Sequence, residues 1–159
     1  MSFFNSFNIS ASGMTAQRLR MDTISQNLAN VNTTRTENGE AYRRKTVVFQ
    51  EMSNGKNFRS HLDNYLNDYR SSNSTATSRR SQSGGGVKVT QVIEDQSPFI
   101  EVYDPTHPDA NGKGYVQMPN VNSVEEMTNL ISANRSYEAN ITAFNATKAM
   151  ASKALEIGR

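Results

Sequence analysis

The sequence predicts an α+β protein in which long N- and C-terminal helices pack as a coiled-coil-like pair. Three observations predict this class. Residues 122–157 carry a heptad-spaced stripe, residues 8–31 carry a second one, and the residues between them contain β-branched and aromatic runs separated by turn-forming residues. We therefore expect a small antiparallel β module and a flexible Ser/Gly-rich segment between the two helices.

A seam of mostly apolar residues defines the C-terminal helix. Its members alternate at three- and four-residue spacing, as the a and d positions of a heptad do: Met127, Leu130, Asn134, Tyr137, Ile141, Phe144, Lys148, Ala151 and Leu155. Ser123 and Glu126 have the spacing of a capping box, and Gly158 follows as a stop. A helix of this length runs on the order of 50 Å at ~1.5 Å per residue. Such a rod needs a partner to cover it.

The N-terminal residues supply that partner. Apolar residues recur every seven positions, with two more on the adjoining row: Phe7, Met14, Met21, Leu28, Ile24 and Val31. This spacing predicts a second amphipathic helix over about 8–31, which Gly13 weakens locally. Periodicity alone leaves two alternatives open, an antiparallel pair that closes one globular core and an elongated structural protein.

Short strands are predicted in the middle of the chain. Residues 42–49 alternate as a strand does, residues 87–93 and 99–103 read as a hairpin or two paired strands, and residues 115–118 form a third short strand. We predict three parts: an N-terminal axial helix (1–34), a middle β module (35–120) and a C-terminal axial helix (121–159).

An insertion of about 51–86 interrupts the β module. Residues 56–69 have the apolar spacing of a short amphipathic helix, whereas residues 70–86 contain Ser, Asn and three consecutive glycines with almost no apolar side chains. Such a segment buries too little surface to offset the entropy of ordering. We expect residues 70–86 to be a flexible linker.

The composition excludes several classes of protein. Only 35% of the residues are hydrophobic, mean hydropathy is −0.68 and the formal net charge is +2, so the sequence predicts neither a large core nor a nucleic-acid binder. Cysteine is absent, so disulfides and thiolate sites are excluded. No stretch approaches the ~20 apolar residues of a membrane span, and no cleaved signal peptide is visible. We expect no direct membrane insertion.

Candidate ligand sites have simpler explanations. Residues 109, 111 and 114 fit positions 1, 3 and 6 of a calcium loop, but position 5 is the cation Lys113 and position 12 is Asn120 where a bidentate Glu is needed. Residues 104–114 therefore read as a rigid turn. The basic triplet 43–45 suits a solvated strand end or an interface rim better than a phosphate site. Catalytic motifs are missing, so we expect no enzyme, no cofactor and no metal.

Three segments near the ends of the chain are distinctive: Ser-Gly-Met-Thr-Ala-Gln at 12–17, Ile-Ser-Gln-Asn-Leu-Ala-Asn-Val-Asn-Thr at 24–33, and residues 126–140. The first two resemble the N-terminal signature of the bacterial flagellar axial proteins, the rod, hook and hook-associated family, and the third resembles the C-terminal signature of that family. Within that family, residues 33–50 and 104–122 are most similar to proximal rod members. The segment from about 51 to 82 is longer than in compact members.

The resemblance implies a structural subunit of the proximal rod that transmits torque from the motor to the hook and forms part of the export channel wall. It also implies export by the flagellar type III apparatus without signal cleavage, and termini that become helical on assembly. The implied location is the basal body, where the rod crosses the periplasm. Implied partners are other rod subunits, the inner-membrane ring with its rod adaptor, and the export apparatus. The alternatives are a secreted helical filament or adhesin unrelated to the rod, and a nucleic-acid binder.

Helix packing and assembly are assigned to a set of seam and signature residues. They are Met14, Met21, Ile24, Asn27, Leu28, Asn30, Met127, Leu130, Asn134, Tyr137, Asn140, Ile141 and Leu155. The apolar members bury surface, and the asparagines supply amide hydrogen bonds at close helix contacts. We hypothesise that polar seam positions set the register between subunits, as a buried Asn does in coiled coils.

Overall fold

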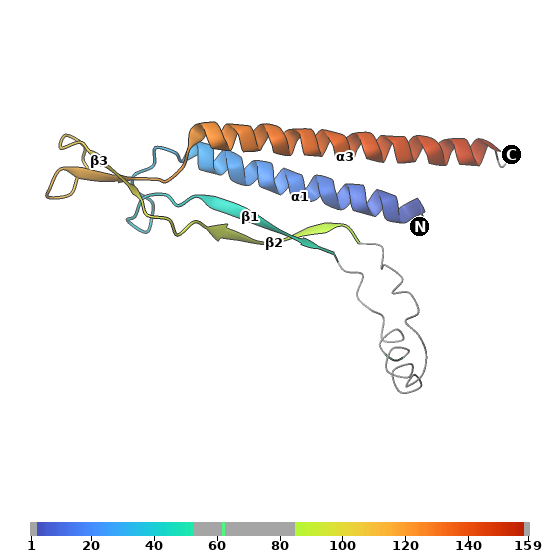
Figure 1. The fold of residues 1–159 in the computed structure, drawn as a ribbon, viewed down its shortest axis with the longest axis horizontal. Helices are drawn as coiled ribbons and strands as arrows, with labels where there is room; N and C mark the ends of the chain where they lie inside the picture. Colours follow the sequence, from blue (N-terminus) through green and yellow to red (C-terminus); the bar gives the residue numbers. More distant parts are fainter. Residues whose placement is uncertain (1–2, 53–61, 63–84, 158–159) are drawn as a thin grey trace, which may run out of the picture.

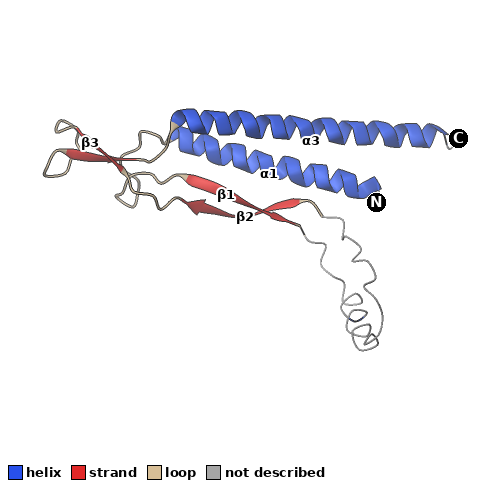
Figure 2. Cartoon of the chain, viewed as in Figure 1, coloured by secondary structure: helices blue, strands red, loops and turns tan. Residues whose placement is uncertain are grey.

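The computed structural model describes residues 3–52, 62 and 85–157, and it shows an elongated α+β molecule (Figure 1). Helix α1 (Phe3–Ala29) and helix α3 (Ser123–Ile157) lie side by side and run antiparallel. A two-stranded ribbon of β1 (Lys45–Glu51) and β2 (Val87–Glu94) packs on the other side of α1. Beyond the helix pair lies a second ribbon of β3 (Ile100–Tyr103) and β4 (Tyr115–Met118) (Figure 2). The predicted fold class is confirmed.

The α1–α3 contact uses a seam that differs from the predicted one at alternate positions. Residues 130, 137, 144 and 151 are at least half-buried, as expected, but the intervening positions that are buried or half-buried include 126, 133, 140 and 147, whereas 127, 134 and 148 are exposed and only 141 of the predicted intervening set is half-buried. The residues at these positions are Glu126, Ala133, Asn140 and Thr147, which are small or hydrogen-bonded. Short side chains let the two helix backbones approach closely, so contact distance outweighs hydrophobicity in choosing this face.

The strands pair differently from the predicted hairpin. Strand β2 pairs antiparallel with β1, from Lys45 opposite Glu94 to Glu51 opposite Val87, with a register shift between Val48 and Phe49. Strand β3 pairs with β4. Between β2 and β3, the Asp95 carboxylate accepts hydrogen bonds from the backbone N–H and hydroxyl of Ser97, a local turn that leads the chain away instead of folding it back. The hairpin of 87–93 with 99–103 was therefore wrong.

Helix α3 begins with a different cap from the predicted one. The Asn122 side-chain oxygen accepts hydrogen bonds from the N–H groups of Val124 and Glu125, at 3.0 and 3.4 Å. Asn122 is thus the N-cap, and the capping box of Ser123 with Glu126 is wrong. The Glu126 carboxylate is occupied elsewhere.

Three sequence expectations lie outside the described residues. They are the amphipathic helix 56–69 apart from the helical Leu62, the flexible linker as far as residue 84, and the stop at Gly158. Among the helices that the structure does describe, none is long and apolar enough to cross a membrane.

Candidate functional site: a polar clamp between the terminal helices

Asn27, in the last turns of α1, is the centre of a buried polar cluster that we call the clamp: Asn27, Tyr42, Arg44, the backbone of Lys45, and Glu126. The Asn27 amide nitrogen donates to the Glu126 carboxylate and to the Lys45 carbonyl, both at 2.9 Å. Its oxygen accepts from the Tyr42 hydroxyl at 3.0 Å and from the Lys45 N–H at 2.9 Å. All four hydrogen-bonding positions of the amide are therefore used.

Glu126 is the charged member of the clamp, and Arg44 neutralises it. The guanidinium Nε of Arg44 donates to Glu126 Oε1 at 2.8 Å, and Nη2 bonds to the same oxygen and to Glu125 at 3.1 Å. Burial lowers the pKa of Arg44, but the hydrogen bond and charge of Glu126 outweigh it, so the pKa lies above its usual value. Burial raises the pKa of the Tyr42 hydroxyl above 10.0, and the charges of Glu94 and Glu126 raise it further.

A buried cluster that is fully bonded admits one arrangement of its members. Displacing α3 by one residue along α1 would leave Glu126 without its amide donor, at a cost of about 1–3 kcal/mol for each buried group left unpaired. The clamp therefore sets the register between α1, the start of β1 and α3.

Gly13 brings the middle of the helix pair into close contact. A Cβ atom built at Gly13 would lie 2.8 Å from the side-chain oxygen of Asn140, closer than real contacts allow. Asn140 itself donates to the Ser136 carbonyl within α3 at 2.8 Å. That Gly13 weakens the helix locally stays a prediction, since α1 runs without a break through this residue, whose missing side chain leaves room for Asn140. Toward the far end of α1, Phe7 packs edge-on against Phe144 with 4.9 Å between ring centroids.

Ser12 docks the β1–β2 ribbon onto α1. Its hydroxyl oxygen accepts the N–H of Val87 at 3.1 Å while donating to the Ile9 carbonyl at 2.7 Å. The neighbouring Gly86 has a φ of 105°, and a side chain there would overlap the Ser12 hydroxyl. Position 86 therefore requires glycine, both for its backbone conformation and for the space beside Ser12.

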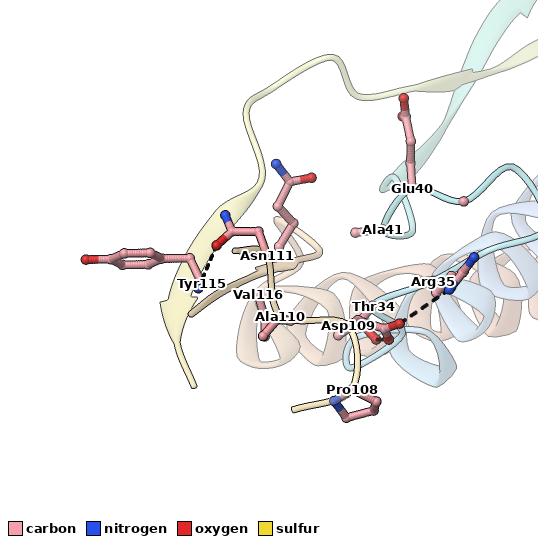
Figure 3. Close-up of a pocket in the computed structure, with 12 residues that line it drawn as sticks. Thr34, Arg35, Glu40, Ala41, Pro108, Asp109, Ala110, Asn111, Tyr115 and Val116 are labelled. Atoms are coloured by element: carbon pink, nitrogen blue, oxygen red, sulfur yellow. Dashed lines mark hydrogen bonds and ion pairs between the residues drawn. The ribbon is translucent and has the colours of Figure 1, made fainter. Parts of the chain in front are cut away.

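A second junction connects the loop after α1 to the turn 104–114 (Figure 3). Thr34 donates to the Asp109 carboxylate at 2.8 Å, and the Arg35 guanidinium lies 3.8 Å from the same carboxylate. Thr34, Arg35 and Asp109 line an open depression of about 400 Å³. Glu40 and Asn111 also line it. The Asn111 side-chain oxygen accepts hydrogen bonds from the N–H groups of Lys113 and Tyr115, so it stabilises the turn. The described residues contain no cluster of three or more His, Cys, Asp or Glu that could hold a metal ion.

The residues assigned to packing and assembly have different environments. Ile24 and Asn27 are buried. Half-buried are Met14, Met21, Leu28, Asn30, Leu130, Tyr137, Asn140 and Ile141, and exposed are Met127, Asn134 and Leu155. Of the four asparagines, Asn27 bonds across to α3, whereas Asn30, Asn134 and Asn140 bond to partners close in sequence. We predict that the three exposed residues contact neighbouring subunits, and a single chain does not test this.

Sequence reasoning missed three side chains of the clamp, and it treated Tyr42 only as the start of the strand 42–49. Glu126 was assigned to helix capping, and Arg44 was treated as part of a solvated basic triplet. One signal was available, because Glu126, Ala133, Asn140 and Thr147 recur every seven residues, parallel to the apolar phase. Choosing the helix contact by hydrophobicity favours the heptad positions of Met127 and Ile141. The neighbouring heptad positions, which carry small and polar residues, were therefore not chosen.

Comparison with known proteins identifies the family. A family model described as "Flagella basal body rod protein" matches residues 7–35, and one described as "Flagellar basal body rod FlgEFG protein C-terminal" matches residues 113–157. The chain is 52% identical to the flagellar basal-body rod protein FlgC of Bacillus subtilis, with full coverage of both chains. It is 43% identical to FlgC of Borreliella burgdorferi over 99% of this chain and 98% of the relative, and 38% identical to FlgC of Salmonella typhimurium with full coverage of both.

The matches to these relatives span the full length or nearly the full length of the chain, well beyond the two terminal segments that the family models match. The chain therefore belongs to the FlgC family of flagellar basal-body rod proteins, and it is a structural rod component of the flagellar basal body.

Proposed function

We propose that this subunit builds the proximal rod by packing its α1–α3 pair against the helix pairs of neighbouring rod subunits. The observation that carries the proposal is the register-locked helix pair, whose longer helix leaves large apolar side chains exposed. Val124, Met127 and Ile131 lie on one face of α3 and are each more than half exposed. Apolar faces of this kind on an elongated subunit favour burial against other subunits.

Torque transmission requires that the inner helices and the outer ribbons move together. The clamp joins the end of α1, the start of β1 and the start of α3 through side chains that are all bonded, and Ser12 joins α1 to β2. Side chains at such points have little freedom to rearrange under load. We therefore assign the helix pair to the rod interior, where it forms part of the export channel wall, and the β ribbons to the outside.

This placement indicates which proteins the subunit contacts. The subunit contacts other rod subunits along the axis, and the inner-membrane ring with its rod adaptor lies below it. The flagellar type III apparatus exports it without cleavage. Met127, Asn134 and Leu155, exposed in the single chain, become contact residues in the assembled rod.

Mass spectrometry of detergent-purified hook and basal bodies tests this function. We expect strong enrichment of the chain over the cytosolic fraction, with its N-terminal residues intact, and a non-motile phenotype when the gene is deleted. Motility should return with the wild-type gene. Absence from basal bodies, with abundance elsewhere, would favour a secreted filament that is not part of the rod.

A further inference from the structure

The turn 104–114 connects β3 to β4 and is held to the rest of the molecule by contacts between loops. Among the helices and strands that the structure describes, β3 and β4 contact only each other. The turn reaches the loop after α1 through the Asp109 carboxylate. Its Oδ2 accepts the Thr34 hydroxyl at 2.8 Å, and its Oδ1 lies 3.8 Å from the Arg35 guanidinium (Figure 3). Whatever moves this carboxylate therefore changes how the turn is held.

His107 lies beside Asp109 and contacts it in two ways. The His107 Nδ1 accepts a hydrogen bond from the Asp109 backbone N–H at 3.1 Å. The same nitrogen lies 4.0 Å from Asp109 Oδ2, the oxygen that accepts the Thr34 hydroxyl. An imidazole nitrogen that accepts a hydrogen bond carries no proton. The arrangement in the structure is therefore the one that a neutral His107 makes.

Charged groups face His107 from its own turn and from the loop after α1. Within the turn they are the carboxylates of Asp104 and Asp109. The Thr106 hydroxyl and N–H hold the pKa of Asp104 below its usual value, and a positive charge on His107 lowers it further. From the loop, Arg35 approaches the Asp109 oxygen that His107 does not. The His107 side chain is 31% exposed, so protons from solvent reach it without any opening of the turn.

We propose that His107 is a pH-dependent switch that joins the turn 104–114 to the loop after α1 at neutral and alkaline pH and releases it in mild acid. Histidine is the side chain that ordinarily changes charge between pH 5 and pH 8. Protonation turns Nδ1 from an acceptor into a donor, so it loses the Asp109 N–H and faces that N–H with one of its own. A backbone contact that holds Asp109 in place is then replaced by repulsion.

The protonated ring also competes for the Asp109 carboxylate. Its Nδ1–H needs to close the present 4.0 Å to Oδ2 by only a short movement to donate a charge-assisted hydrogen bond, which is stronger than the neutral one from the Thr34 hydroxyl. Asp109 then turns toward its own turn and away from Thr34 and Arg35. All of these contacts lie within one chain, so the switch goes beyond the proposed function and does not depend on it.

Double electron–electron resonance on the full-length chain tests the switch. The sequence contains no cysteine, so spin labels attach only at introduced ones. Gly112→Cys places one label on the exposed turn, where a side chain meets nothing within 4 Å, and Ser25→Cys places the other at an exposed site on α1. We expect one narrow distance distribution at pH 8 and a broader, shifted one at pH 5, which narrows again when the pH is raised.

The chain offers a matched pair of histidine substitutions. His107→Gln, which stays neutral at both pH values, should keep the distribution narrow at both. His61→Gln, at the only other histidine in the sequence, should keep the wild-type response to pH. Thr34→Val should broaden the distribution already at pH 8, because it removes the hydrogen bond that protonation of His107 weakens.

A second label pair separates local release from general unfolding. Ser25→Cys with Lys88→Cys reports on α1 and the β1–β2 ribbon, and its distribution should be the same at both pH values. Broadening of both pairs at acid pH, an unchanged Ser25–Gly112 distribution in the wild type, or a wild-type response in His107→Gln would each overturn the switch. None of these results bears on enrichment of the chain in basal bodies, so the proposed function fails or holds separately.

Discussion

Asn27 and Glu126 are 99 residues apart in the sequence, yet the amide of one donates to the carboxylate of the other at 2.9 Å. Both residues are only 1% exposed, and theirs are the largest fully buried side chains among the described residues. A protein with few buried apolar residues has thus placed a polar pair where its two terminal helices converge. Such a pair specifies alignment more than it adds stability, because each member costs free energy to bury unless the other is present.

Replacing Asn27 with alanine should destabilise the fold markedly. The substitution leaves the Tyr42 hydroxyl, the Lys45 N–H and one Glu126 oxygen without the amide that bonds them. Each buried group left unpaired costs about 1–3 kcal/mol, so we expect the free energy of unfolding to fall by at least about 2 kcal/mol. Urea unfolding followed by circular dichroism measures it.

Asn134→Ala is the matched control for this change. Asn134 is exposed and bonds to Glu138 on its own helix, so its loss should change the free energy of unfolding by less than about 0.5 kcal/mol. Equal effects of the two substitutions would show that the clamp does not hold the helices together.

Gly86→Ala should destabilise the docking of the β1–β2 ribbon. Both Gly86 and Gly39 have positive φ, which costs a non-glycine residue roughly 1–2 kcal/mol. A side chain at Gly86 also displaces the Ser12 hydroxyl from the Val87 N–H, whereas one at Gly39 meets nothing within 4 Å. We expect Gly86→Ala to exceed Gly39→Ala by about 1 kcal/mol or more in urea unfolding, with faster hydrogen exchange at Val87. Equal losses from the two substitutions would mean that backbone strain alone explains the effect.

Alkaline pH should weaken the clamp through Tyr42. Its pKa is raised in the folded state by burial and then by the charges of Glu94 and Glu126, so folding favours the protonated hydroxyl. This contribution is fully present below the unfolded pKa of about 10 and is lost as pH rises from there through the folded pKa. Urea unfolding between pH 9 and pH 11 should show a steeper loss of stability in the wild type than in Tyr42→Phe. Parallel curves would argue against this linkage.

Asp109→Ala should loosen the turn 104–114 from the loop after α1. The carboxylate accepts the Thr34 hydroxyl and lies near the Arg35 guanidinium. Losing this partly buried bond should cost on the order of 1 kcal/mol and speed hydrogen exchange in residues 104–114. Asp22→Ala, at an exposed site on α1, should leave that exchange unchanged. Thr34→Val should resemble Asp109→Ala, and combining the two should add little, because they remove the same bond.

Many features of this protein were readable from its residues. Heptad spacing indicated both helices, and alternation together with β-branched and aromatic runs indicated the segments that form β1, β2, β3 and β4 to within a few residues. The terminal signatures predicted the family, which the full-length identities confirm. Asn27 was assigned to helix packing and assembly, and the structure shows its amide bonded to Glu126 on α3, a partner that the sequence did not indicate.

The pairing of these elements was not readable in the same way. Residues 42–49 and 87–93 are separated by a long insertion, so nothing local indicates that they pair, whereas the nearer segments 87–93 and 99–103 suggested a hairpin that does not form. Both β1 and β2 lie against α1, and Ser12 with Gly86 and Val87 holds β2 there beside β1 through contacts between residues distant in sequence.

By itself, the sequence determined the type and approximate extent of the helices and strands, because backbone preference and side-chain periodicity act over a few neighbouring residues. Only the tertiary structure decided which of two adjacent heptad phases on α3 faces α1, and whether Glu126 caps a helix or joins a clamp. Those choices depend on how closely another backbone approaches and on which buried donors need an acceptor. Both are properties of contacts between distant parts of the chain, such as Gly13 with Asn140 and Asn27 with Glu126.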